Sequence, residues 1–252
     1  MEVHHPHHPS HKKDIKEYIL EFFMLFFAVT LGFFAENIRE HFTEVEKSEK
    51  YLHQLIVDLS QDTIKINACL KFKDIKERQA DSLIILLNEV KPGDKTNKLY
   101  YYSRIISIRE PFYGAEGTLK QLQNAGGFSI IHNDDLVESI NLYIAAKEKI
   151  YQIQDMQDFS SLQMRGSSNK LFFSKYEHEM LDIHNNKDYR YFIKPITENP
   201  PLLTYDKIAI NDYANWVEWV MTSEKYDYVL LSRLKLRAID LINQIKHELN
   251  EE

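Results

Sequence analysis

YILEFFMLFFAVTLGFFA, residues 18–35, is the one long apolar run in this chain of 252 residues, and the expected fold follows from it. The run contains one charge, Glu21, and no proline. As an α-helix it measures roughly 27 Å, close to the ~30 Å hydrocarbon core of a bilayer. Glu21 lies one turn inside the boundary, where its side chain can extend to the headgroups. The run therefore predicts a transmembrane helix over residues 17–36.

A buried core helix and a cleaved signal peptide are the two alternatives to a membrane span. Six phenylalanines within residues 22–35 make the run apolar around its whole circumference, which is not typical of the amphipathic helices that cover a soluble core. Signal peptidase requires small residues at positions −1 and −3 of its site. With Ala35 at −1, Phe33 falls at −3, so we expect an uncleaved anchor.

The flanks of the run bear on its orientation. Three lysines precede it and three basic residues follow it within 15 residues, so the positive-inside rule does not decide. We expect residues 1–16 to be a disordered, histidine-rich head without the fixed geometry that a metal site needs. Its histidines add partial positive charge, and the flank after the run is acidic. These two features favour the N-terminus inside and the large domain outside.

The pattern after the run predicts that its helix continues. Neither Gly nor Pro occurs between Phe33 and Lys91, and Glu49 and Thr63 interrupt an otherwise apolar stripe. The spacing of the stripe alternates between four and three residues, which is typical of a coiled-coil stalk or of the first helix of an intramolecular bundle. Its members are Ile38, Phe42, Val45, Leu52, Ile56, Leu59, Ile66 and Leu70. Apolar residues beside this stripe widen the face and favour the bundle.

The remaining chain reads as helices separated by turns, beginning with the turn KPGDKTNK at residues 91–98. We expect a short extended link at Phe128–Ile131, a cap at Asn133 or Asp134, and helices at 99–109, 119–124, 135–164 and 170–183. Residues 206–221 and 224–249 close the chain as one bent helix or as two consecutive helices. The predicted fold class is all-α: one N-terminal transmembrane helix that continues into a long helix, with an extramembrane helical bundle over residues 37–252.

Composition bears on nucleic-acid binding and on sites built from cysteine. The net charge is −7 and the basic residues are dispersed, which argues against a nucleic-acid surface. Cys69 is the single cysteine, so an intrachain disulfide and a cysteine-based zinc site are excluded.

The candidate chemical motifs are weak. His178 and Asp182 are four residues apart within Glu177–Asp182 and would share one helix face, but a zinc site needs at least three ligands. Asp134 and Asp135 suit a helix cap better than an acid–base pair. The segment Gly114–Thr118 lacks the lysine and the spacing of a phosphate-binding loop.

Aromatic residues are the other candidates. Trp216 and Trp219 lie three residues apart, and Tyr100–Tyr102 form a short run. Side chains of this kind can line a ligand pocket, but at helical spacing they more often belong to the core. We therefore expect no catalytic, cofactor-binding or metal-binding residue, and no cofactor.

Two segments carry a resemblance to a known group of proteins: LGFFAENIREH, residues 31–41, and TLKQLQNAGGFSIIHNDDLVESINLY, residues 118–143. Together with the intervening helix they resemble uncharacterised single-pass membrane proteins of Bacteroidetes, similar to the DUF6090-like families. Those families have no assigned activity. The resemblance implies a bacterial envelope protein with one span and a helical domain, and it carries no catalytic residues across. With the orientation expected above, the anchor lies in the bacterial inner membrane and the helical domain in the periplasm.

The expected function is that of a membrane-anchored structural or interaction protein of the envelope, not an enzyme. Its partners are the lipid bilayer and either a second copy or another envelope protein. Gly32 and Ala35 form a small-xxx-small pair through which two spans can approach each other. The alternative is an extracytoplasmic ligand-sensing bundle that signals through a partner.

Overall fold

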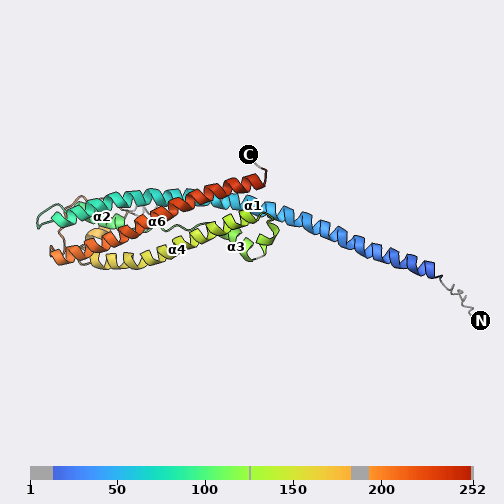
Figure 1. The fold of residues 1–252 in the computed structure, drawn as a ribbon. Helices are drawn as coiled ribbons and strands as arrows, with labels where there is room; N and C mark the ends of the chain where they lie inside the picture. Colours follow the sequence, from blue (N-terminus) through green and yellow to red (C-terminus); the bar gives the residue numbers. More distant parts are fainter. Residues whose placement is uncertain (1–13, 125, 183–192, 251–252) are drawn as a thin grey trace, which may run out of the picture. The chain divides into compact units, whose positions relative to one another are not determined.

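The computed structural model describes residues 14–124, 126–182 and 193–250. Within them the chain forms these helices: α1 (Ile15–Glu89), α2 (Asn97–Ser107), α3 (Gly117–Asn124), the 3-10 helix η1 (Gly127–Ile130), α4 (Asp134–Ser168), α5 (Ser174–Glu179) and α6 (Lys207–Glu248). A single antiparallel bridge joins Leu181 to Ile193, and these residues form no longer strand. The predicted all-α class, a long N-terminal apolar helix followed by a helical bundle, is confirmed (Figure 1).

The chain divides into two compact units, residues 1–50 and 51–252. The first unit contains the N-terminal part of α1, and an 18-residue window there has a mean hydropathy of 2.0 with none of its residues buried. Among the described helices, α1 is the one long and apolar enough to cross a membrane. Of the expected disordered head, residues 1–13 lie outside the described residues, whereas Ile15 and Lys16 are helical.

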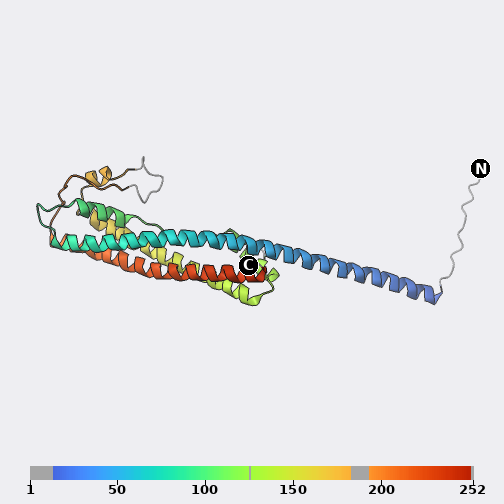
Figure 2. The ribbon, with the colours of Figure 1, turned by 90° about the horizontal axis from the view of Figure 1, so that it is seen from above.

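Three long helices build the second unit: residues 51–89 of α1, α4 and α6. They lie side by side in both ribbon views, with α1 and α4 running in one direction and α6 in the other (Figures 1 and 2). Two hydrophobic clusters agree with this arrangement. One joins the C-terminal part of α1 to Met164 of α4 and the start of α6, and the other joins Leu52 to Leu136 and Ile245.

Each long helix buries residues that alternate three and four positions apart, which is the spacing of helices that pack at shallow left-handed angles. In α1 these are Leu52, Leu55, Leu59, Asp62, Ile66, Cys69, Lys73, Lys76, Ala80, Leu83 and Leu87. In α6 they are Ile210, Tyr213, Val217, Val220, Glu224, Asp227, Leu231, Leu234, Ala238, Leu241 and Ile245. In α4 they are Ile140, Tyr143, Lys147, Ile150, Gln154, Gln157, Ser161 and Met164.

The stripe predicted for α1 was half right. Leu52, Leu59 and Ile66 are buried as expected, but the intervening positions Ile56, Thr63 and Leu70 are only half-buried. The structure buries Leu55, Asp62 and Cys69 in their place. Polar residues occupy three of the eleven buried α1 positions, namely 62, 73 and 76, and they hide the true stripe from a search for apolar residues alone.

Several predicted boundaries were also wrong. Helix α4 runs through Gly166 to Ser168, and the helix expected at 170–183 is reduced to α5. Of the two alternatives for the C-terminal part, a single helix is correct, since α6 is continuous from Lys207 to Glu248. Burial explains these continuations, because the three-four pattern continues through the polar positions of both helices.

The link between α3 and α4 is a 3-10 helix where an extended segment was expected, and two glycines make it compact. Gly126 has a φ of +65°, a conformation that glycine adopts without strain. A Cβ on Gly127 would lie 2.8 Å from the Cα of Leu122, so only glycine allows η1 to pack this closely on α3. Thr118 lies inside α3 and does not cap it.

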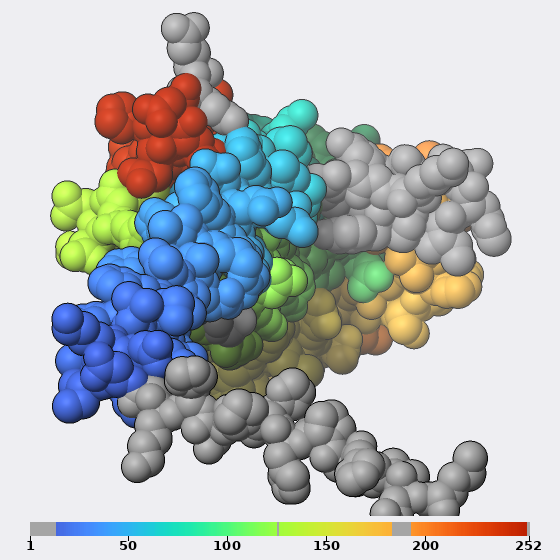
Figure 3. All heavy atoms as spheres, turned by 90° about the vertical axis from the view of Figure 1, so that its right-hand side faces the viewer, coloured from blue at the N-terminus to red at the C-terminus, as the bar shows by residue number. Residues whose placement is uncertain are grey.

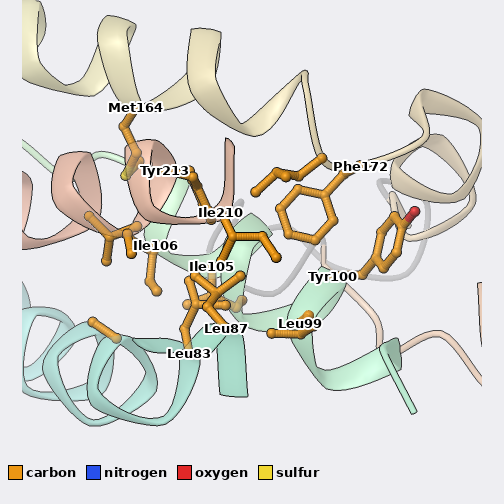
Figure 4. Close-up of a cluster of buried hydrophobic side chains, with 14 of the residues drawn as sticks. Leu83, Leu87, Leu99, Tyr100, Ile105, Ile106, Met164, Phe172, Ile210 and Tyr213 are labelled. Atoms are coloured by element: carbon orange, nitrogen blue, oxygen red, sulfur yellow. The ribbon is translucent and has the colours of Figure 1, made fainter. Parts of the chain in front are cut away.

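Polar bonds secure both ends of the second unit. At one end the Asn133 amide donates to Glu248 Oε2 (2.6 Å), and Figure 3 shows the C-terminal end of α6 (red) beside the yellow-green α3 region. At the other end, Tyr213 and Phe172 point into the cluster that Figure 4 shows. The Tyr213 hydroxyl donates to Ser103 Oγ (2.7 Å), so its polar atom is satisfied inside the apolar surroundings.

Leu231 and Leu236 provide a matched test of the assignment of α6. Leu231 is 0% exposed and Leu236 is 66% exposed on the same helix. We expect Leu231→Ala to lower the free energy of unfolding by about 2–5 kcal/mol, because it leaves a cavity in the core. Leu236→Ala should change it by less than about 0.5 kcal/mol. Urea denaturation of the full chain in detergent, followed by circular dichroism, measures both; equal losses would contradict the assignment.

Candidate functional site

A layer of charged and amide side chains separates the two hydrophobic clusters of the bundle. Lys73 and Lys76 of α1 and Glu224 and Asp227 of α6 occupy buried three-four positions, and we call these four residues the ionic layer. Helix α4 faces it with two further buried polar residues, Gln154 and Gln157. All three long helices therefore become polar at the same level of the bundle.

Glu224 is the centre of the ionic layer. One of its carboxylate oxygens pairs with the Lys73 ammonium, and the other accepts from Lys76 Nζ at 2.7 Å. Lys73 also contacts Asp227 Oδ2 at 2.7 Å. The second Asp227 oxygen, Oδ1, is buried and finds no donor among the described residues. Two ammoniums and two carboxylates thus neutralise each other away from water.

The pKa values of the layer follow from burial opposed by these pairs. Burial alone would raise the pKa of Glu224, but Lys76 and Lys73 outweigh it and lower this pKa to about 2. Burial would lower the pKa of Lys73, yet Glu224 and Asp227 together raise it.

For Lys76 and Asp227 burial prevails instead. It lowers the pKa of Lys76 despite Glu224, and it raises the pKa of Asp227 despite Lys73. The ion pair of Glu224 with Lys76 thus lowers the pKa of the acid without raising that of its base. The reason is that Glu224 receives two ammoniums, whereas Lys76 receives one carboxylate and also lies near the Lys73 charge.

The extended segment 108–116 covers the ionic layer on the side of α1 and α4. Arg109 of this segment pairs with Asp158 and donates to the Gln154 carbonyl oxygen at 3.0 Å. The Gln154 side-chain amide, with its nitrogen towards the Phe112 carbonyl (3.1 Å) and its oxygen towards the Phe112 N–H (3.0 Å), holds the same segment. The layer and the segment above it are therefore one connected polar structure.

A second polar cluster fastens the end of segment 108–116. The Asp62 carboxylate accepts from the Ala115 N–H and from the Tyr143 hydroxyl, both at 2.7 Å. Lys147 donates to the Ala115 carbonyl at 2.8 Å. A Cβ on Gly114 would lie 2.8 Å from Asp62 Oδ2, so the close approach requires glycine. Burial, with the Asp62 charge, raises the pKa of Tyr143 and keeps its hydroxyl a donor.

The charged groups of these two clusters pair mainly with each other and with the backbone of segment 108–116. The described residues contain no group of three His, Cys, Asp or Glu side chains that could hold a metal ion. Buried charges that pair across two helices restrict the register in which those helices can pack. The ionic layer is thus suited to specifying how α1 and α6 pack against each other.

The metal-like motif does not assemble into a site. Helix α5 ends at Glu179, so Asp182 is not on the helix of His178, and the two do not share a helix face. His178 is exposed, and His184 lies outside the described residues.

The candidate acid–base pair and the candidate phosphate-binding loop both have structural roles. The cap of α4 is Asn133, whose Oδ1 accepts from the Leu136 N–H at 3.1 Å, while Asp134 and Asp135 are exposed in the first turn. The N–H groups of Ala115 and Thr118 lie against the carboxylates of Asp62 and Asp58, which would repel a phosphate.

The aromatic candidates divide between core and surface. Tyr100 is buried, and its hydroxyl donates to the Pro201 carbonyl at 2.9 Å. Tyr101, Tyr102 and Trp216 pack partly against the same cluster, as expected. Trp219 does not: it is 67% exposed, which is contrary to the prediction that it belongs to the core.

Trp219 belongs to an apolar groove between α4 and α6 that the sequence analysis missed. The groove has a volume of about 460 Å³ and is lined by Ile153, Met156, Phe159, Ser160, Trp219, Ser223 and Tyr226. The sequence does contain a signal for this groove, namely a second series of α4 residues spaced three and four positions apart. Its members Ile153, Met156 and Ser160 each come one position before a buried residue: Gln154, Gln157 and Ser161.

A smaller groove of about 240 Å³ lies between α1 and α2. Phe72, Ile75 and Ile105 line it, with Lys71 among the lining residues. The side-chain oxygen of Gln79, which also lines the groove, is buried and finds no donor in the described part of the chain. This groove can accept a small, mostly apolar molecule that brings a hydrogen-bond donor.

Comparison with protein-family models, with curated proteins and with solved structures finds no match to this chain.

Replacing Glu224 tests whether the ionic layer holds the bundle. Glu224→Gln leaves Lys73 and Lys76 buried without their shared counter-charge, so we expect the free energy of unfolding at pH 7 to fall by about 3–5 kcal/mol. Glu218→Gln, an exposed change two turns earlier in α6, is the control and should be near neutral. Urea denaturation of both variants provides the comparison.

The pH dependence gives the same prediction a second readout. The pKa of Glu224 is lowered in the folded state from 4.5 to about 2, so its stabilising effect is complete above pH 4.5 and is lost as the pH falls towards 2. The stability difference between wild type and Glu224→Gln should therefore shrink below about pH 4.5. A difference that stays constant down to pH 2.5 would contradict the assignment.

Proposed function

We propose that this chain is a membrane-anchored structural or interaction protein of the bacterial envelope. Residues 17–36 cross the inner membrane once, and residues 51–252 form a periplasmic bundle that binds another protein. The observation that carries the proposal is an unburied apolar window in α1, together with an uncovered apolar groove on the bundle. The resemblance to single-pass proteins of Bacteroidetes supports an envelope protein with one span.

The exposed window supports an anchor. In a soluble protein a helix of this composition would be packed inside, because each Å² of apolar surface left in water costs about 25 cal/mol. Here the window has no buried residue, and Phe26 and Phe27 at its centre are more than half exposed. A bilayer supplies the apolar surroundings that the protein does not.

The arrangement of the polar groups supports an interaction role in place of catalysis. The buried charges of the ionic layer pair with each other, and the Asp62 cluster holds a backbone segment. The groove between α4 and α6 is lined by apolar and aromatic side chains and two serines, which suits the docking of a protein surface.

Two arginines at the centre of the window test the anchor. We expect Phe26→Arg/Phe27→Arg to move the full chain from the membrane pellet to the supernatant after alkaline extraction, because each arginine at the centre of a span costs about 2.5–3.5 kcal/mol. Phe42→Arg lies outside the window and should leave the chain in the pellet. The retained chain should have its full mass of 29.9 kDa. A wild type in the supernatant, or one cleaved after Ala35, would refute the anchor.

A ligand-sensing bundle is the second candidate, favoured by the groove between α1 and α2 with its unpaired Gln79 oxygen. The larger side chain of Ile75→Trp should fill this groove without disturbing the packing of the core. If the groove has a ligand, a screen of small apolar donors will raise the Tm of the wild type and leave that of Ile75→Trp unchanged. Equal responses of both proteins would remove this candidate.

A further inference from the structure

The groove between α1 and α2 has an apolar stretch that lies between two polar groups. Phe72 and Ile75 of α1 and the Tyr101 ring of α2 contribute to its walls. On α1 this stretch is preceded by Lys71 and followed by Gln79, which also line the groove. These two residues lie about 12 Å apart along the helix axis. The groove is therefore built for a molecule that is apolar in the middle and polar at both ends.

The volume of the groove limits the size of that molecule. Its volume of about 240 Å³ lies below the range of ~300–1,000 Å³ that is usual for drug-sized ligands. At about 30 Å³ for each water molecule in the liquid, it corresponds to roughly eight waters, or a ligand of about ten non-hydrogen atoms. A peptide helix or a lipid acyl chain is much larger, so the size favours a small molecule.

The charges around the groove are basic. Between positions 61 and 82, the exposed charged residues within about a quarter turn of the lining face of α1 are Lys65, Lys71 and Arg78. Helix α2 adds Lys98 and Arg104 and contains no acidic residue. A concave surface with charges of one sign concentrates ligands of the opposite sign. The groove therefore favours an anionic ligand.

The nearby acidic residues do not line the groove. Asp74 is about a third of a turn away from the lining face of α1, and Glu110 belongs to segment 108–116 beyond the end of α2. Neither contributes to the lining, in which Lys71 is the charged residue. The acidic group of a ligand therefore meets an ammonium in the groove and no carboxylate.

Gln79 provides a contact for the other end of the ligand. Its side-chain oxygen is buried and finds no donor among the described residues, which is an unfavourable state for an acceptor. The side chain as a whole is half-buried and lines the groove, so a rotation of its amide turns this oxygen towards a bound molecule. A hydroxyl group on the ligand satisfies the acceptor, and an apolar group in the same place leaves it unpaired.

We propose that the groove between α1 and α2 binds a small hydroxylated aromatic acid. Its carboxylate pairs with the Lys71 ammonium, its ring packs against Phe72, Ile75 and Tyr101, and its hydroxyl donates to Gln79 Oε1. The inference rests on the ligand-sensing candidate for the function and names the chemical class of the ligand.

Thermal unfolding of the full chain in detergent tests the inference, with 3-(4-hydroxyphenyl)propanoate as the probe. We expect the Tm of the wild type to rise with the probe concentration and to give a saturable affinity. The affinity for 3-phenylpropanoate, which lacks the hydroxyl, and for the methyl ester of the probe, which lacks the charge, should each be about five-fold lower. Ile75→Trp, which fills the groove, should not respond to any of the three.

Substitutions at the two polar ends assign the contacts. Lys71→Met should lower the affinity for the probe about five-fold and leave that for its ester unchanged, whereas Lys71→Arg should preserve both. Gln79→Leu should remove the difference between the probe and 3-phenylpropanoate. Lys149→Met, at an exposed lysine of α4, is the control and should bind as the wild type does. Circular dichroism establishes that each variant is folded.

Four results overturn the inference: no rise in the Tm of the wild type, a rise that Ile75→Trp retains, equal affinities for the acid and its ester, and tighter binding of decanoate than of the probe. The last result would identify a fatty acid as the ligand. If neutral apolar donors still stabilise the wild type and not Ile75→Trp, the ligand-sensing candidate stands without this ligand class, so the two failures are distinguishable.

Discussion

The rest of the bundle depends on the pairing of four buried charges. Helix α1 contributes Lys73 and Lys76, and helix α6 contributes Glu224 and Asp227. An unpaired charge at this depth costs several kcal/mol, so α1 and α6 must meet in the one register that joins acid to base. A shift of α6 by one heptad would bring Val217 and Val220, or Leu231 and Leu234, against the two lysines. The apolar positions on either side of the layer tolerate such a shift far better than the layer does.

The same constraint explains the elements around the long helices. Gln154 and Gln157 of α4 continue the polar layer, and Gln154 in turn holds segment 108–116. That segment covers the groove between α1 and α4 and ends at the Asp62 cluster. The polar interior therefore determines which side of the bundle is covered, and the apolar groove between α4 and α6 has no such cover among the described residues.

The sequence was sufficient for the fold class, because the apolar run at residues 18–35 and the helical spacing after it are strong local signals. It was insufficient for the buried stripe of α1, since Asp62, Lys73 and Lys76 are hydrophilic and their burial depends on partners up to 151 residues away. Trp219 was misassigned for a related reason. A tryptophan at helical spacing is core in most helices, and only the packing of α4 against α6 shows that this one faces outward. Neither the ionic layer nor the groove is encoded in any short motif.

The direction of α4 has a consequence for how the chain is made. Because α4 runs parallel to α1, the chain must return along the whole bundle before its second long helix can pack, and helix α6 closes the structure last. During synthesis Lys73 and Lys76 emerge about 150 residues before Glu224, so they must remain in water, or with a chaperone, until their counter-charge arrives. Contacts that span so much of the chain are slow to form. The middle of α6, where Glu224 lies, must therefore be synthesised before the two lysines can be buried with their counter-charge.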